Sequence, residues 1–460
     1  MTRIAVRVLK VVAIVTVVAA ALVAGLAYAM IRHFNTPPPA ASYPRPANDL
    51  EARRQDLTYF RELVALDRSF DPAARALAER HIARLEASGV AVDPAHFRVG
   101  LMEILALADN GHTRLDIRDD AHPKQLPVRV GVFADGLYVM GATDATVELL
   151  GSRIVAIDRK PIEVVMKRLA ALRGGTAAWR RLNAARYLTD PEILFGSDIS
   201  TDAERSVWTV ATSADKTESV TVRATDLDDP VDGMSDRWVA MHPDKPLPPS
   251  LRDFGTPFRR IRLGQSCAML IQLKANHDVG AQHIKDFVTA TEADMRAHKP
   301  CAAIVDLRFD DGGNYQNTAA FAKDLPELTQ PGGPIYVLTG PATFSAGITT
   351  VAFIKQAGGD RVTILGEPVG DRLQFFSEGN RGCLPNRPLC VSYQRGKHDY
   401  AHPCTDWDVC FWLNKLYPVR VNSLEPQERL TLSFPQWRQG RDPTFERAVE
   451  LAMRVNFTQH

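Results

Sequence analysis

The chain has 460 residues, of which 45% are hydrophobic and 24% are charged, and its formal net charge at pH 7 is +1. This length suits two or three domains, each with room for a hydrophobic core. Because the net charge is close to zero and no basic stripe alternates with aromatic residues, we do not expect nucleic acid as a partner.

An apolar segment without charged residues, 11–31, lies near the N-terminus. A helix of this length rises about 31 Å, enough to cross the hydrocarbon core of a bilayer. Arg3, Arg7 and Lys10 precede it, and positive charge keeps that flank in the cytoplasm, so we expect the bulk of the chain to be exported. Residues 27–29 (Ala-Tyr-Ala) also fit a signal-peptidase site, which leaves two alternatives. The chain is anchored in the inner membrane facing the periplasm, or it is secreted to the periplasm after cleavage.

Six cysteines follow in the exported part, and an even number in an oxidising compartment indicates disulfides. Two pairs are close in sequence and would close small loops, whereas the third would join the starts of two predicted strands. A zinc site is the competing interpretation, but the CxxC spacing is missing. The expected pairs are Cys383–Cys390, Cys404–Cys410 and Cys267–Cys301.

After the membrane segment (1–32), a Pro/Ala-rich linker over 33–47 leads to a helical cap region over 48–125. Asp71-Pro72 and Asp93-Pro94 each combine an N-cap residue with proline in the first turn, which predicts two helix starts. The turn 109–113 (DNGHT) follows the last of these helices and carries His112.

Residues 126–225 change to a strand pattern, with strands predicted at 128–133 and 136–140, then "LLGSRIVAID", a helix over 162–172 and a hairpin. This order resembles a PDZ-like module. The resemblance implies that an extended peptide adds as a strand beside Gly136, Leu137, Tyr138 and Val139. A generic small β domain is the alternative.

Residues 250–455 alternate between strand and helix patterns, which predicts a parallel sheet covered by helices. In such folds the chemistry lies on turns after the strands. The expected strands are 268–273, 302–307, 335–339 and 362–365, and the expected helices are 281–296, one near 318, and 345–356.

Two of these turns carry the candidate chemistry. Turn 306–314 contains Gly312 and Gly313, which let backbone amides face a ligand without an intervening Cβ. Turn 339–347 places Ser345 at the first turn of a helix, where amide donors and the helix dipole favour a developing anion. Taken alone, each signal is weak, because a serine at a helix start is most often only an N-cap.

Taken together and in this order, the segments resemble the C-terminal-processing (tail-specific) and tricorn-like serine peptidase family. The matching pieces are "ALADNGHTRL", "LLGSRIVAID", "IVDLRFDDGG", "YVLTGPATFSAG", "TILGEPVG" and "LEPQERL" with "QGRDPTFERAVELA". The resemblance implies an α/β fold with a crotonase-like or Clp-like ββα catalytic domain, a PDZ-like module and a helical cap.

By this resemblance Ser345 is the nucleophile, and the amides of Ala346 and of Gly312 or Gly313 form the oxyanion hole. One branch of the family uses a lysine about two dozen residues after the serine, but 366–372 contains none. Lys355 lies about 15 Å along the same predicted helix, out of reach.

The other branch uses the histidine of the "D(G/S)HT" turn, which is His112 here. The carboxylate linked to it is expected to be Glu425 of "LEPQ", with Asp406 and Asp408 as weaker candidates inside a cysteine-rich insertion over 397–417. In that branch a serine beside the histidine takes part, and Gly111 occupies its place.

Two further departures from the family pattern are Asp310 in place of asparagine and Gln427 in place of aspartate. We therefore predict an exported serine peptidase that hydrolyses peptides or unfolded chain ends, with a catalytically inactive peptide- or ligand-binding protein on the same fold as the alternative. No cofactor is expected, and without HExxH or a His/Asp cluster no metal site is expected either. The substrate and the oligomeric state stay open.

Overall fold

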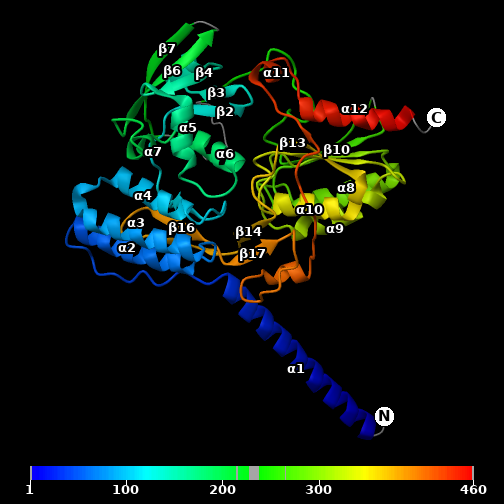
Figure 1. Ribbon diagram of the computed structural model, residues 1–460. Helices are drawn as coiled ribbons and strands as arrows, with labels where there is room; N and C mark the ends of the chain where they lie inside the picture. Colours follow the sequence, from blue (N-terminus) through cyan, green and yellow to red (C-terminus); the bar gives the residue numbers. More distant parts are fainter. Residues whose placement is uncertain (1–2, 214–215, 227–237, 265, 458–460) are drawn as a thin grey trace.

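The computed structural model describes residues 3–213, 216–226, 238–264 and 266–457. Its first helix, α1 (Arg3–Phe34), projects from the body of the molecule as a single rod (Figure 1). Within the described residues, Leu9–Phe34 is the one helical stretch long and apolar enough to cross a membrane, judged by length and composition. The predicted apolar helix is confirmed and ends slightly later than expected.

The segment expected to be a linker after the membrane helix is fastened to the body. Phe34 is fully buried. The Tyr393 hydroxyl donates to the Thr36 carbonyl at 2.6 Å, and the Tyr59 hydroxyl donates to the Pro39 carbonyl at 2.8 Å. Prolines offer no amide donor, so this extended segment is held through its carbonyl oxygens instead.

The helical cap consists of α2 (Asp49–Leu66), α3 (Pro72–Ser88) and α4 (Pro94–Ala106). The Asp71 and Asp93 side chains cap α3 and α4 as the sequence predicts. The cap helices pack against a three-stranded antiparallel sheet in the order β1-β16-β15, so the cap core contains residues from two distant parts of the chain. These strands are β1 (Arg114–Ile117), β15 (Asn380–Cys383) and β16 (Leu389–Tyr393).

A second module is built on an antiparallel sheet in the order β2-β3-β4-β6-β7. Helix α5 (Ile162–Ala170) packs on it, as do α6 (Ala177–Tyr187) and α7 (Pro191–Gly196). The predicted strands at 128–133 and 136–140, the strand in LLGSRIVAID, the helix after it and the hairpin are all present, whereas the PDZ-like assignment stays a prediction. The strands are β2 (Val128–Phe133), β3 (Gly136–Ala142), β4 (Arg153–Ile157), β6 (Arg205–Ser213) and β7 (Lys216–Arg223).

The C-terminal part contains a six-stranded sheet in the order β18-β13-β12-β11-β10-β9, parallel except for β9. Helices α8 (Ile284–His298), α9 (Gln316–Leu328) and α10 (Ala346–Gly358) bury one face, and α12 (Pro443–Phe457) buries the other. The predicted α/β class is confirmed. The strands are β9 (Phe258–Arg262), β10 (Met269–Leu273), β11 (Ala303–Asp306), β12 (Ile335–Thr339), β13 (Val362–Gly366) and β18 (Glu428–Arg429).

All three expected disulfides are present: Cys267–Cys301, Cys383–Cys390 and Cys404–Cys410. A two-stranded ribbon of β14 (Gln374–Ser377) and β17 (Gly396–Asp399) leads from the sheet into the cysteine-rich insertion. The remaining short elements are η1 (Gly89–Ala91), η2 (Asp144–Leu149), β5 (Lys160–Pro161), β8 (Val239–Ala240), η3 (Gly359–Arg361), η4 (Trp412–Lys415) and α11 (Phe434–Arg438).

Candidate active site

The turn between β12 and α10 holds Ser345 in an uncommon backbone conformation, with φ +51° and ψ −121°. Non-glycine residues rarely adopt positive φ, and strain of this kind often accompanies function. The Ser345 side chain forms no N-cap hydrogen bond, so it does not play the ordinary role of a serine at a helix start. Two bonds fasten the turn to the neighbouring loop: Phe344 N–H donates to the Asp310 carbonyl at 2.9 Å, and Thr343 Oγ1 donates to the Leu307 carbonyl at 2.8 Å.

Gly312, the first of the paired glycines in the preceding loop, lies directly against this serine. Gly312 and Gly313 both have positive φ, at +114° and +131°. A Cβ on Gly312 would lie 2.6 Å from the Ser345 Cβ and 3.2 Å from the Ala346 nitrogen, so only glycine fits there. The Gly312 amide already donates to Asp310 Oδ1 at 3.1 Å, which leaves the amides of Ala346 and Gly313 as the candidate oxyanion donors.

Asp310, the departure from the family's asparagine, is completely buried behind this turn. The side-chain amide of Asn276 donates to its Oδ2 at 2.8 Å. Burial raises the pKa of Asp310 well above its usual range, against the opposing effect of the Gly312 and Asn276 hydrogen bonds. Aspartate is nearly isosteric with asparagine, so this substitution preserves the shape of the site.

His112 reaches the same place from the cap. Its ring lies between the rings of Phe344 and Phe375, with centroid distances of 4.3 Å and 5.3 Å. Its carbonyl accepts a hydrogen bond from Gln394 Nε2 at 3.0 Å, so a distant strand fixes the turn. His112 and Ser345 line one cavity of about 490 Å³. The structure thus brings the predicted nucleophile and the predicted base together.

Burial, followed by the nearby positive charges, lowers the pKa of His112 well below its ordinary value. The imidazole is therefore neutral at pH 7, the state required of a general base. Neither ring nitrogen has a hydrogen-bond partner among the described residues, so the Ser345 hydroxyl is not bonded to the ring in this conformation.

The carboxylate next to the His112 ring is Asp371, whose Oδ2 lies 3.9 Å from Nδ1. Its side chain is only 1% exposed. Burial raises the pKa of Asp371 to about 6, while the amide and guanidinium of Arg372 oppose this rise. Because Arg372 N–H donates to Oδ1 at 2.8 Å, Oδ2 is left without a hydrogen bond and directed at the histidine.

The structure also explains why glycine precedes the histidine. A Cβ on Gly111 would lie 2.9 Å from Asp371 Oδ2 and 2.8 Å from the Phe344 ring. The Asp371 carboxylate thus fills the space where the family has a serine side chain. Asp371 was not among the residues predicted from the sequence. The available signal was its carboxylate in segment 366–372, which was considered only for its lack of a lysine.

The carboxylates favoured by the sequence are engaged elsewhere. The Glu425 side chain is 62% exposed and accepts a hydrogen bond from Arg429 at 2.9 Å. Asp406 Oδ1 accepts the Asp408 amide at 2.9 Å, and Asp408 pairs with Arg68. The structure does not bring these three side chains to His112.

Two of the four residues predicted to bind peptide line a cavity. Gly136 and Leu137 border a cavity of about 260 Å³, together with apolar side chains of α5. Tyr138 instead stacks on Phe434 at 4.0 Å, and Val139 is fully buried with its amide bonded to the Ser152 carbonyl at 3.1 Å. Any strand addition on this module would therefore centre on the Gly136 end of β3.

No family model and no curated protein matches the chain. Solved structures of mature CPAF share its fold. The complex with lactacystin aligns with a TM-score of 0.54 at 12% sequence identity, covering 88% of this chain and 98% of that chain. A CPAF mutant aligns with a TM-score of 0.55 at 12% identity, over 88% and 97% of the two chains.

A photosystem II C-terminal processing protease covers 74% of this chain and 87% of its own at 10% identity, but its TM-score of 0.35 is too low to support an argument. The comparison with CPAF therefore shows a shared fold.

Proposed function

We propose that this protein is a membrane-anchored serine peptidase with Ser345 as nucleophile and His112 as general base. The observation that carries the proposal is the cavity lined by both residues, which are far apart in sequence. The fold shared with mature CPAF supports it.

The residues present can perform each step of acyl transfer. The neutral His112 ring accepts the Ser345 hydroxyl proton as the oxygen attacks the peptide carbonyl, and it later returns that proton to the leaving amine. The Ala346 and Gly313 amides donate to the oxyanion. Water then attacks the acyl-enzyme with His112 again as base, which releases the acid and restores Ser345.

We assign Asp371 the task of holding His112. Its ionised carboxylate faces Nδ1, which favours the tautomer with the proton on Nδ1 and stabilises the imidazolium that forms. The 3.9 Å separation and the unbonded ring nitrogens describe a resting geometry, and catalytic hydrogen bonds commonly tighten only in the substrate complex. Glu425 takes no part in this mechanism.

The substrate class we propose is peptides or unfolded chain ends on the exported side of a membrane. The apolar helix α1 and the three disulfides support this location, because disulfides persist in oxidising compartments. An extended chain entering beside β3 would be presented to the cavity of Ser345 from the neighbouring module.

A fluorophosphonate, which reacts covalently with activated serines, tests the proposal. The full-length protein is expected to be labelled on Ser345 alone, and Ser345→Ala should abolish both labelling and peptide hydrolysis. Ser423→Ala removes an exposed serine outside the site and serves as the matched control. Full activity in Ser345→Ala would overturn the assignment.

The second candidate function is peptide binding without catalysis. The observation that favours it is the resting site itself, in which His112 makes no hydrogen bond to Ser345. This candidate predicts that the wild-type protein binds peptides but is not labelled at any pH.

A further inference from the structure

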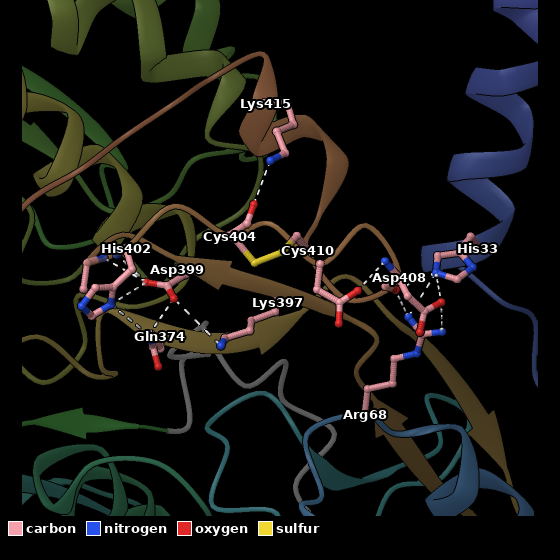
Figure 2. The surroundings of a disulfide bond; sticks show 12 residues. His33, Arg68, Gln374, Lys397, Asp399, His402, Cys404, Asp408, Cys410 and Lys415 are labelled. Atoms are coloured by element: carbon pink, nitrogen blue, oxygen red, sulfur yellow. Dashed lines mark hydrogen bonds and ion pairs between the residues drawn. A yellow bond between two sulfur atoms is a disulfide. The ribbon is translucent and has the colours of Figure 1, made fainter.

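The cysteine-rich insertion contacts the C-terminal end of the membrane helix. Figure 2 shows His33 of α1 and Arg68 of the cap converging on Asp408, inside the loop closed by Cys404–Cys410. Arg68 Nη2 lies 3.1 Å from Asp408 Oδ1, and His33 Nε2 lies 2.7 Å from the Asp408 carbonyl oxygen. The loop is thus tied to both the membrane helix and the cap.

The end of α1 is also built into the protein core. Phe34, its last residue, is fully buried and packs edge-to-face on Phe411 with a centroid distance of 5.5 Å. Arg395 Nε donates to the His33 carbonyl at 2.9 Å. The C-terminal end of α1 is therefore held firmly against the insertion. Phe34 lies three residues beyond the apolar segment, a rise of only about 4.5 Å, so a bilayer crossed by α1 would have its headgroups at the level of the insertion.

The insertion carries exposed side chains of the kind found at membrane surfaces. Trp407 and Leu416 are each 63% exposed, more than any other large hydrophobic side chain outside α1 in the described part of the chain. The ammonium of Lys415 lies 5.1 Å from the centre of the Trp407 ring. Tryptophan concentrates at the boundary between headgroups and acyl chains, and lysine extends its charge toward the headgroups.

We propose that residues 404–416, here called the Trp407 loop, form a second membrane contact beside α1. Trp407 and Leu416 enter the headgroup boundary, and the occupant of this apolar surface is the bilayer in which α1 is embedded. The contact would fix how the catalytic domain is oriented over the membrane. The proposal rests on α1 being a retained anchor, which is part of the proposed function, and it does not depend on the peptidase chemistry.

Tryptophan quenching by brominated lipid tests this contact. The full-length protein is reconstituted in phosphatidylcholine vesicles with and without bromine near the top of the acyl chains. Trp407→Phe should lower the lipid-dependent quenching by more than about half, since an interfacial tryptophan contributes most of that signal. The matched control is Trp437→Phe in α11, at the far end of the body from α1, and it should leave the quenching unchanged (Figure 1).

Vesicle flotation and fluorophosphonate labelling in the same samples separate the possible failures. If the protein floats but quenching is equal in wild type and Trp407→Phe, the loop contact is overturned and the α1 anchor is not. Protein that does not float would overturn the anchor and the loop together. Loss of labelling with quenching intact would count only against the peptidase function. A second variant, Leu416→Glu, places a charge at the headgroup boundary and should also reduce the quenching of Trp407.

Discussion

The two turns that meet in the candidate active site are held by different means. The Ser345 turn is shaped by backbone conformation, with φ +51° at the serine and φ +114° at Gly312, which lies against it. The His112 turn is shaped by its surroundings, since two phenylalanine rings sandwich the imidazole and Asp371 lies beside it.

This contrast indicates which part of a catalytic site is encoded locally. Within a few residues the chain specifies a strand, a strained turn and a helix start, and these position Ser345, the proposed nucleophile. The base is positioned by packing among the cap, β14 and the loop after β13, so its geometry depends on long-range contacts. Substitutions in the two turns should consequently affect the protein for different physical reasons.

The largest effect is expected from His112→Ala, which removes the proposed base. Loss of general base catalysis costs about 10²- to 10⁴-fold, and kcat should fall by that factor with little change in KM. Steady-state hydrolysis of an unfolded polypeptide measures both constants. Unchanged kcat in the variant would remove His112 from the mechanism.

Gly312→Ala should break the local turn. The added Cβ would lie 2.6 Å from the Ser345 Cβ, so we expect activity to fall about 10²-fold or more through displacement of the nucleophile. Gly332→Ala is the matched control, because Gly332 also has positive φ, +75°, but a Cβ there meets nothing within 4 Å. Alanine at positive φ destabilises the backbone by about 1 kcal/mol in both variants, and only Gly312→Ala should lose activity. Equal activity of Gly312→Ala and Gly332→Ala would contradict the close approach of Gly312 to Ser345.

Asp371→Asn should change how stability depends on pH. The folded-state pKa of Asp371 is about 6, above the ordinary value near 4 for an unfolded chain. Its contribution to the free energy of unfolding is therefore fully present below pH 4 and is lost as the pH rises through 6. Relative to wild type, Asp371→Asn should gain up to about 3 kcal/mol between pH 4 and pH 8.

Urea denaturation at several pH values measures this difference. His112 has the opposing effect, because its depressed pKa gives a contribution present above pH 6.5 and lost on acidification. Asp360→Asn, at an exposed carboxylate, is the matched control. If the free energy of unfolding changed with pH in the same way in wild type and Asp371→Asn, the Asp371 carboxylate would not be a buried charge.

The smallest effect is expected from Asp310→Asn, which restores the family's residue. Burial disfavours the charged form of Asp310, and the asparagine amide is nearly isosteric with the carboxyl group, so we expect little change in the shape of the site. Stability should stay within about 1 kcal/mol of wild type, and activity within a few-fold. A large gain in activity would show that Asp310 is ionised and inhibits the site.

Much of the catalytic sheet was predictable because its strands are continuous apolar runs that end in glycine-rich turns. Strand β12 has the predicted bounds, and Ser345 lies where the strand–turn–helix pattern puts it. The three disulfides were also predictable, since the cysteines in each pair either are close in sequence or begin predicted strands. These features depend on local patterns.

The partner of His112 was not predictable in the same way. The family motif pointed to Glu425, which lies on the surface and pairs with Arg429. Asp371 takes the place beside the ring only because Gly111 leaves room for its carboxylate, a complementarity between residues far apart in sequence. The fastening of residues 34–39 to the body was missed for a similar reason, since the proline-rich composition does not reveal which side chains will bond its carbonyls.

The rate at which a fluorophosphonate labels Ser345, followed against pH in wild type and Asp371→Asn, tests the central claim most directly. We predict that the wild-type rate rises as the pH passes about 6, where Asp371 ionises beside a neutral His112, and reaches a plateau above pH 7. In Asp371→Asn the plateau should be lower by about 10²-fold and the rise near pH 6 should disappear. Identical rates and profiles for the two proteins would contradict a histidine base oriented by Asp371.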